Sequence, residues 1–296
     1  MSKKAEFMKS QLNMIKPLIK FVPLPLERLW QNKLGDIIRK DYTKKVKYTK
    51  IKLKNIECEI VTPKEIRKDI VILYLHGGGF CVGDIEYARG FASALAAHIK
   101  CKTMCVEYRL APNHKFPCAL LDVLDAYKYL LKNGYTEDKI FLCGESAGGG
   151  LCYSLCLKLK KMGKPLPKAV ITISPWVDLT LQSATYELNK ENDPSLTYEK
   201  LQKYAEMYTD TPKNPLASPR FARSFKGMPK NMTIVSNNEV LLGDSHLIHS
   251  KYIKEGIDST LVITPDMWHA YVINGVPESK KDLAEIDKFI MEVMCE

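Results

Sequence analysis

The sequence predicts an α/β fold with a mostly parallel central sheet and helices on both faces of that sheet. Continuous apolar runs at residues 70–75 and 169–173 are typical of strands that are buried on both faces. Segments whose apolar residues have helical spacing alternate with such runs along most of the chain. This alternation gives parallel strands joined by right-handed crossovers. Residues 179–216 interrupt it, which indicates an inserted lid.

The first 62 residues precede the regular alternation. Residues 1–40 carry apolar residues at helical spacing and are divided by prolines, so we expect amphipathic helices. Such helices can lie on a membrane or cover a cleft, and packing onto the body of the protein is the favoured interpretation. The runs 46–53 and 56–61 predict an antiparallel strand pair at a sheet edge.

From residue 70 onward, expected strands and helices follow each other in order. Strands are expected at 70–75, 102–108, 140–143, 169–173, 232–236 and 260–264, and helices at 87–99, 116–131, 151–161, 245–255 and 278–294. Within the insertion, residues 197–208 also have helical spacing. The predicted organisation is therefore N-terminal cap helices at 1–45, an α/β core formed by 46–178 and 217–296, and an inserted cap element at 179–216.

Length and composition favour one large domain. The chain has 296 residues, of which 46% are hydrophobic, so it can bury a large core. Its apolar runs fall short of the roughly 18 residues that span a bilayer. Lysines and prolines break the apolar segment 14–26, so we expect neither a membrane-spanning segment nor a signal peptide. The nine cysteines lie mostly in apolar segments without C-x-x-C spacing, which favours reduced core residues in a cytoplasmic protein.

The net charge of +10 does not by itself indicate a nucleic-acid partner. Lysines crowd residues 40–54, and several alternate along a strand-like stretch, which is typical of a solvated face. No nucleic-acid motif accompanies them. We therefore expect no nucleic-acid partner, and attraction to acidic surfaces is left open.

One pentapeptide, Gly144-Glu145-Ser146-Ala147-Gly148, carries the strongest chemical signal. It has the G-x-S-x-G pattern and lies between an apolar, strand-like run and a segment with helical spacing. In a strand–turn–helix context this pattern exposes a nucleophilic serine at the tip of a strained turn. The sequence therefore predicts Ser146 as a nucleophile.

Three consecutive glycines, 77–79, follow the buried run 70–75. Their conformational freedom lets a backbone bend sharply and approach a ligand. After a strand of this kind, a loop supplies N–H donors to the oxyanion that forms when a serine attacks a carbonyl group. A phosphate loop is disfavoured because no Gly-Lys-Ser/Thr follows. We interpret His76 as an orienting residue of this loop.

A nucleophilic serine needs a general base, and the base needs an orienting acid. Downstream of Ser146 the histidines are His246, His249 and His269, and the first two lie in a helical stretch. His269 follows a strand, at the sheet edge where ligands bind, and is the predicted base. For the acid, Glu239 lies just past the strand 232–236 and is preferred; Asp244 stays the alternative, with a helix-capping role as its simpler interpretation.

Four motifs together resemble the hormone-sensitive lipase family of α/β hydrolases, the acetyl-esterase-like carboxylesterases. They cover roughly residues 70–275. The motifs are His76-Gly77-Gly78-Gly79, Tyr108-Arg109-Leu110-Ala111-Pro112 with Phe116-Pro117 and Asp122, Gly144-Glu145-Ser146-Ala147-Gly148-Gly149, and Ser174-Pro175-Trp176-Val177-Asp178-Leu179.

The resemblance implies an α/β-hydrolase fold with a helical cap, in which the N-terminal helices and the insertion cover the active site. It implies that the backbone N–H groups of Gly78, Gly79 and Ala147 form the oxyanion hole. One departure concerns the acid: most members have Asp-Pro-Leu where this chain has Glu239-Val240-Leu241. A branch of the family carries Glu followed by Val-Leu-Leu, so Glu239 is kept.

The expected function is a serine carboxylesterase that hydrolyses short-chain acyl esters with Ser146, His269 and Glu239 and uses no cofactor or metal. The partner is a small-molecule ester, and a homodimer is a weak expectation from the resemblance. A non-catalytic receptor on the same fold and a peripheral lipid-ester hydrolase are the alternatives. The presence of His269 argues against the receptor, and the basic, amphipathic N-terminus suggests the lipid-ester hydrolase. Amide or thioester cleavage would use the same residues.

Overall fold

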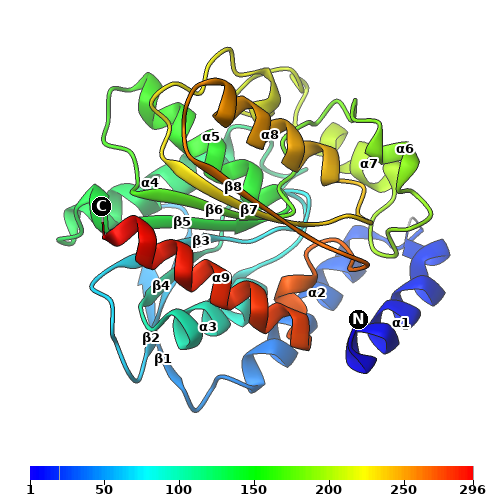
Figure 1. Ribbon diagram of the computed structural model, residues 1–296, viewed down its shortest axis with the longest axis horizontal. Helices are drawn as coiled ribbons and strands as arrows, with labels where there is room; N and C mark the ends of the chain where they lie inside the picture. The colour runs from blue at the N-terminus through cyan, green and yellow to red at the C-terminus, as the bar shows by residue number, and fades with distance from the viewer. Residues whose placement is uncertain (20, 296) are drawn as a thin grey trace.

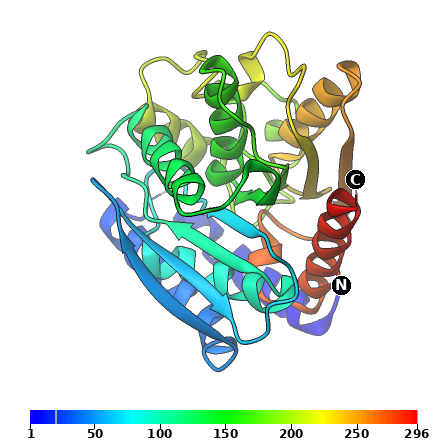
Figure 2. The ribbon, with the colours of Figure 1, turned by 90° about the vertical axis from the view of Figure 1, so that its left-hand side faces the viewer.

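A computed structural model describes residues 1–19 and 21–295. It contains an eight-stranded sheet in the order β1-β2-β4-β3-β5-β6-β7-β8. Strands β3 to β8 run parallel, whereas β1 pairs antiparallel with β2 and β2 with β4. The strands are β1 (Val46–Lys52), β2 (Glu57–Pro63), β3 (Val71–Leu75), β4 (Lys102–Val106), β5 (Ile140–Glu145), β6 (Ala169–Ile173), β7 (Lys230–Ser236) and β8 (Ser259–Thr264). The predicted antiparallel pair at a sheet edge is confirmed (Figure 2).

Helices cover both faces of the sheet (Figure 1). Strand β3 shows why, because it is buried along its whole length: Leu73 and Leu75 belong to one apolar cluster, and Ile72 and Tyr74 to the other. The first cluster includes residues of α4 (Cys118–Lys132), α5 (Ala147–Lys161) and α8 (Leu242–Lys254), and the second includes residues of α3 (Ile85–Ile99) and α9 (Pro277–Met294). The predicted α/β architecture with helices on both faces is confirmed.

The N-terminal segment forms two helices, α1 (Lys3–Ile19) and α2 (Leu24–Lys40). Pro17 lies inside α1, close to its carboxyl end, and so does not divide the segment, whereas Pro23 is the N-cap of α2 and Pro25 lies in its first turn. Helix α2 crosses α3 at very close range: a Cβ atom on Gly35 would lie 2.4 Å from Cα of Tyr87. Only glycine permits this approach, so the crossing fixes α2 to the core.

The insertion contains two short helices, α6 (Thr185–Leu188) and α7 (Tyr198–Tyr208). In Figure 1 they lie at the same end of the molecule as α1 and α2. The loops that follow β3, β5, β7 and β8 reach toward this end, because the carboxyl ends of parallel strands share one sheet edge. Three short 3₁₀ turns, at Glu137–Lys139, Pro219–Phe221 and Tyr271–Asn274, complete the elements. Among the described residues, no helix is both long and apolar enough to cross a membrane.

Candidate active site

Ser146 lies on a sharp turn between β5 and α5, the context that the sequence predicts. Its backbone has φ 54° and ψ −122°, a combination that non-glycine residues adopt rarely and at a cost in strain. The turn is tight because α5 begins directly against the neighbouring strand: a Cβ atom on Gly148 would lie 2.0 Å from the carbonyl oxygen of Leu75. The side chain of Ser146 nevertheless lines a cavity at this sheet edge. Such strain at a cavity wall is typical of a catalytic nucleophile.

The glycine loop after β3 borders the same cavity. Gly78 and Gly79 have φ values of +99° and +60°, which favour glycine. Across the described part of the chain, no protein acceptor receives a hydrogen bond from the backbone N–H groups of Gly78, Gly79 or Ala147. The N–H of Ala147 is also the first of helix α5, where the helix dipole favours negative charge. These donors are therefore available to an oxyanion.

His76 is fully buried in this loop. Its ring stacks on Tyr108 at 4.2 Å between centroids, and its Nδ1 lies 2.7 Å from the carbonyl oxygen of Gly77. Burial lowers the pKa of His76 to about 4, against which its hydrogen bond to Gly77 acts only partly. The ring is thus a neutral packing element of the glycine loop.

His269 follows β8 and faces the cavity that Ser146 lines. Its Nδ1 lies 3.4 Å from Oε1 of Glu239, whose side chain is fully buried. Burial lowers the pKa of His269, but the hydrogen bond and the negative charge of Glu239 together outweigh burial, so the pKa lies above its usual value. Because Nδ1 faces the carboxylate, Nε2 is the ring nitrogen that is left for another partner.

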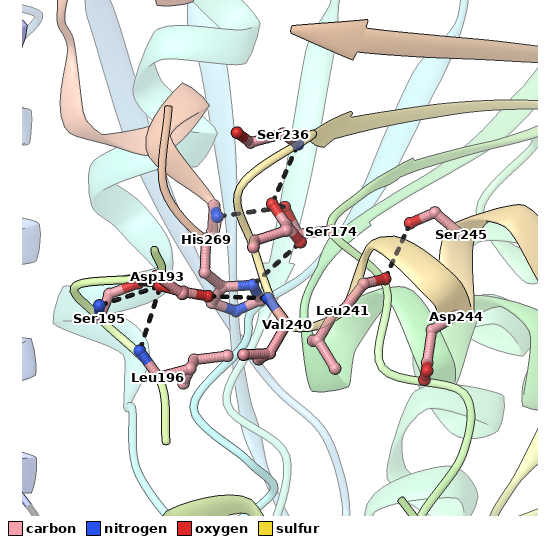
Figure 3. A network of polar contacts seen from close by, with 12 residues as sticks. Ser174, Asp193, Ser195, Leu196, Ser236, Val240, Leu241, Asp244, Ser245 and His269 are labelled. Atoms are coloured by element: carbon pink, nitrogen blue, oxygen red, sulfur yellow. Dashed lines mark hydrogen bonds and ion pairs between the residues drawn. The ribbon is translucent and has the colours of Figure 1, made fainter. Parts of the chain in front are cut away.

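Glu239 is held in place by two donors on its other oxygen. The Ser174 hydroxyl donates to Oε2 at 2.7 Å, and the Ser236 N–H donates to the same atom at 3.1 Å. Ser174 Oγ also accepts a hydrogen bond from the Ala270 N–H at 3.1 Å, which ties the histidine loop to the acid (Figure 3). This network fixes both members of the pair relative to each other.

Asp244, the alternative acid, is used elsewhere. Its carboxylate accepts hydrogen bonds from the N–H groups of Val177 and Asp178 at 2.8 and 3.0 Å, and from the Tyr186 hydroxyl at 3.0 Å. In Figure 3 it lies away from the ring of His269. Burial raises the pKa of Asp244 to about 7. Asp244 therefore caps the loop after β6 instead of its own helix, which differs from the helix-capping role expected from the sequence.

Three polar residues join the site without having been predicted from the sequence: Ser174, Asp193 and Glu145. Asp193, in the insertion, accepts a hydrogen bond from the Val240 N–H at 3.1 Å and so braces the loop that carries Glu239. It is fully buried, and its charge contributes to the raised pKa of His269 after the larger effects of burial and Glu239. The sequence signal for Ser174 is its place in the Ser174–Leu179 motif, whereas nothing near Asp193 distinguishes it from surface acids.

Glu145, directly before the nucleophile, anchors the glycine loop. Its Oε1 accepts hydrogen bonds from the Gly77 N–H at 2.6 Å and from the Tyr87 hydroxyl at 3.1 Å, and its Oε2 accepts one from the Tyr74 hydroxyl at 2.6 Å. Burial raises the pKa of Glu145 to about 7, although these hydrogen bonds act in the opposite direction. The residue at the second position of the G-x-S-x-G pattern thus holds the first glycine of the loop, Gly77, in place.

Other motif residues form the scaffold. Arg109 donates two side-chain hydrogen bonds to Asp122, at 2.8 Å from Nη2 and 2.9 Å from Nε. Phe80 and Trp176 are buried core aromatics. All nine cysteines are free, and seven of them are buried. Within residues 1–19 and 21–295, no group of three or more His, Cys, Asp or Glu side chains could hold a metal ion.

The cavity has a volume of about 430 Å³, and its walls are mainly apolar. Helices α1, α2 and α7 supply much of its lining, including Leu12, Trp30 and Leu201. A polar cluster joins two of these helices: Lys200 of α7 forms an ion pair with Glu27 of α2, and the Tyr204 hydroxyl donates to the same carboxylate. The segments expected to cover the site therefore contact each other above it.

Known proteins share this fold and sequence pattern. A family model described as the alpha/beta hydrolase fold matches residues 72–273. An acetyl-hydrolase of Streptomyces hygroscopicus is 34% identical over 203 residues, which are 68% of this chain and 67% of that protein. An esterase of Acinetobacter venetianus is 32% identical over 224 residues, 74% of each chain. Among solved structures, a hormone-sensitive lipase from a metagenome library is similar with a TM-score of 0.92 and 30% identity, covering 99% of both chains. An esterase from the bacterial hormone-sensitive lipase family has a TM-score of 0.88 and 29% identity, covering 96% of this chain and 98% of its own.

Proposed function

We propose that this chain, which belongs to the α/β hydrolase family and is a carboxylic ester hydrolase, cleaves short-chain acyl esters with a Ser146–His269–Glu239 triad. One observation carries the assignment of the residues. A strained Ser146, the glycine loop and a His269 that faces a buried carboxylate all border one cavity. Within the described residues, the other two candidate histidines, His246 and His249, do not line this cavity.

In the first half of the reaction, Oγ of Ser146 attacks the ester carbonyl carbon while Nε2 of His269 takes the hydroxyl proton. The carbonyl oxygen becomes an oxyanion, which the N–H groups of Gly78, Gly79 and Ala147 stabilise. When the intermediate collapses, His269 gives its proton to the leaving alcohol and an acyl-serine is left. Water then repeats the sequence as nucleophile: His269 takes its proton, the acid is released, and Ser146 recovers its hydrogen.

The role of Glu239 follows from its position. It keeps the proton of neutral His269 on Nδ1, so that Nε2 presents a lone pair to the serine, and it stabilises the imidazolium that forms. The raised pKa of His269 matches that role, since it means that the charged ring is favoured beside the carboxylate. Ser174 and Asp193 act through Glu239 and its loop and are positioning residues.

The size and chemistry of the cavity support small acyl esters as substrates. A volume of about 430 Å³ with apolar walls suits short acyl and alcohol groups, and the names acetyl-hydrolase and esterase of the relatives point the same way. Residues 1–45 and 179–216 act as the cap that closes this cavity. They supply α1, α2 and α7, and the core 46–178 and 217–296 supplies the catalytic groups.

The test compares Ser146→Ala with the wild type on p-nitrophenyl acetate and p-nitrophenyl butyrate. Losing a triad serine costs about 10⁶ in kcat, so hydrolysis by the variant should fall to background. Ser154→Ala is a matched control, because Ser154 lies in α5, the helix that follows Ser146, and donates to the Gly150 carbonyl at 3.0 Å. The proposal fails if Ser146→Ala keeps its activity. A purified wild type that binds a ligand but does not react with a fluorophosphonate would favour the receptor instead.

A further inference from the structure

The two N-terminal helices expose large apolar side chains to solvent. Among the described residues, 19 large hydrophobic side chains are exposed, and ten of them lie within residues 1–40. We call this set the N-terminal apolar face: Met1, Phe7, Met14, Ile15, Leu18, Phe21, Leu26, Leu29, Trp30 and Ile37. Exposed apolar residues that gather on one surface usually mark an interaction site.

The spacing of these residues puts them on one side of each helix. Phe7, Met14 and Leu18 are seven and four residues apart in α1, and their side chains are 65%, 76% and 62% exposed. Leu26, Trp30 and Ile37 are four and seven residues apart in α2. Residues at these intervals lie above one another on a helix. Each helix therefore has an apolar side that faces away from the core.

The opposite sides of the same helices are already used. In α1, Ala5 is buried, and Met8 and Leu12 line the cavity. In α2, Gly35 and Ile38 are buried. Hydrogen bonds also tie α1 down: Lys9 donates to the Asp266 carbonyl at 2.7 Å. The exposed side chains consequently belong to helices that are held in place, with a second apolar side left over.

The segment that carries this face has a positive net charge. Residues 1–40 contain nine lysines and arginines against three acidic residues. Lys33 lies between Leu26 and Ile37 on the outward side of α2, because it is seven and four residues away from them. An amphipathic helix with lysines beside large apolar residues is typical of the interface of an anionic membrane.

The face is continuous with the active-site cavity. Trp30 is 49% exposed and also lines the cavity, so one side chain connects the outer surface to the inner wall. Met8 and Leu12 of α1 line the same wall. An apolar route thus runs from the outer side of the helices to the cavity of Ser146. A second protein molecule on this surface would gain nothing from that continuity, whereas a lipid surface would deliver apolar esters along it.

We propose that the N-terminal apolar face docks this protein on an anionic lipid surface, with Phe7, Met14 and Leu18 inserted and the neighbouring lysines near the headgroups. The docking itself does not depend on catalysis. That ester substrates enter from the surface rests on the function proposed above.

The experiment measures co-sedimentation of the full chain with vesicles of phosphatidylcholine, with and without phosphatidylserine. The wild type should bind the anionic vesicles, and binding should weaken as salt is raised. The affinity of the variant Phe7→Ser/Met14→Ser/Leu18→Ser for these vesicles should fall by at least about tenfold, because the variant loses three inserted apolar groups. A matched control, Ile66→Ser/Ile253→Ser/Met291→Ser, removes three exposed apolar side chains elsewhere and should bind like the wild type.

Hydrolysis of dissolved p-nitrophenyl butyrate and the thermal midpoint should be unchanged in both triple variants, which shows that they fold. Ser146→Ala should still bind vesicles, so a failure of the proposed chemistry leaves docking measurable. The proposal is overturned if the wild type does not bind anionic vesicles, if the N-terminal variant binds equally well, or if the control loses as much. A lipid-free dimer that the N-terminal variant dissociates would instead assign the face to a second copy.

Discussion

Replacing Glu239 by Gln changes one carboxylate oxygen into an amide NH₂ group and leaves the shape of the side chain unchanged. The backbone N–H of Ser236 and the hydroxyl of Ser174 both donate to Oε2. Because the backbone N–H can only donate, the carbonyl oxygen of the new amide must stay at that position. The NH₂ group then takes the place of Oε1, which faces Nδ1 of His269 at 3.4 Å.

This arrangement reverses the tautomer of His269. An NH₂ group donates to Nδ1, so the neutral ring must carry its proton on Nε2, the atom that has to receive the proton of Ser146. A wrong tautomer in a Ser-His-acid triad costs about 10⁴ in kcat. That factor corresponds to about 5 kcal/mol of lost transition-state stabilisation.

The assay is kcat and KM for p-nitrophenyl butyrate across a pH series, with the thermal midpoint as a check on folding. We expect Glu239→Gln to lower kcat by about 10⁴ with little change in KM. Glu239 raises the pKa of His269, so removing its charge lowers that pKa and moves the acid limb of the residual activity to lower pH.

Asp244→Asn is the matched control, because Asp244 bonds to the loop after β6 and should leave kcat within a few-fold of the wild type. The reasoning is refuted if Glu239→Gln retains near-normal kcat while Asp244→Asn loses it.

Three further predictions test other parts of the site. Gly79→Ala should abolish most activity, because Gly79 has φ +60° and its new Cβ atom would lie 2.1 Å from Cδ2 of Tyr204. The control Gly163→Ala has the same φ in open space and should retain full kcat. Equal losses of kcat in the two variants would exclude an effect specific to the oxyanion loop. Glu145→Ala should lower kcat by roughly 10² with a small change in KM, the order of one lost oxyanion donor, and unchanged kinetics would show that the loop holds without this anchor. Burial raises the pKa of Asp244 to about 7 in the folded state, so its contribution to the free energy of unfolding decreases as pH rises from about 4 to about 7. In Asp244→Asn the thermal midpoint should therefore depend less on pH over that window. An unaltered pH dependence of the midpoint would contradict the raised pKa.

The sequence predicts the strands well because buried parallel strands leave an unambiguous apolar run. Residues 169–173 form β6 with the predicted bounds. The start of α5 is predicted less well: the predicted helix begins at residue 151, whereas in the structure it begins at Ala147. Glycines 148–150 have poor helix propensity, but tertiary packing outweighs it, since a Cβ atom on Gly150 would lie 2.3 Å from the Trp176 carbonyl oxygen.

The residues of the candidate site also fall into two groups, those that a local sequence pattern identifies and those that only the folded chain reveals. Ser146 and His269 are identified by local patterns, a turn between strand and helix and a histidine after a strand. Asp193 lies 46 residues before Glu239 in the chain and braces its loop through a contact that no local pattern encodes. The choice between Glu239 and Asp244 likewise depends on the folded chain, in which Glu239 faces His269 and Asp244 faces the loop after β6.

The most direct test of the central claim is covalent labelling of Ser146 with a fluorophosphonate, followed by intact-protein and peptide mass spectrometry. The reagent mimics the tetrahedral state and reacts with a serine only when a base and an oxyanion hole activate it. We predict one adduct per chain, located on Ser146, and loss of esterase activity in proportion to labelling. Full inhibition with an adduct on another residue, or active protein without any adduct, would contradict the account.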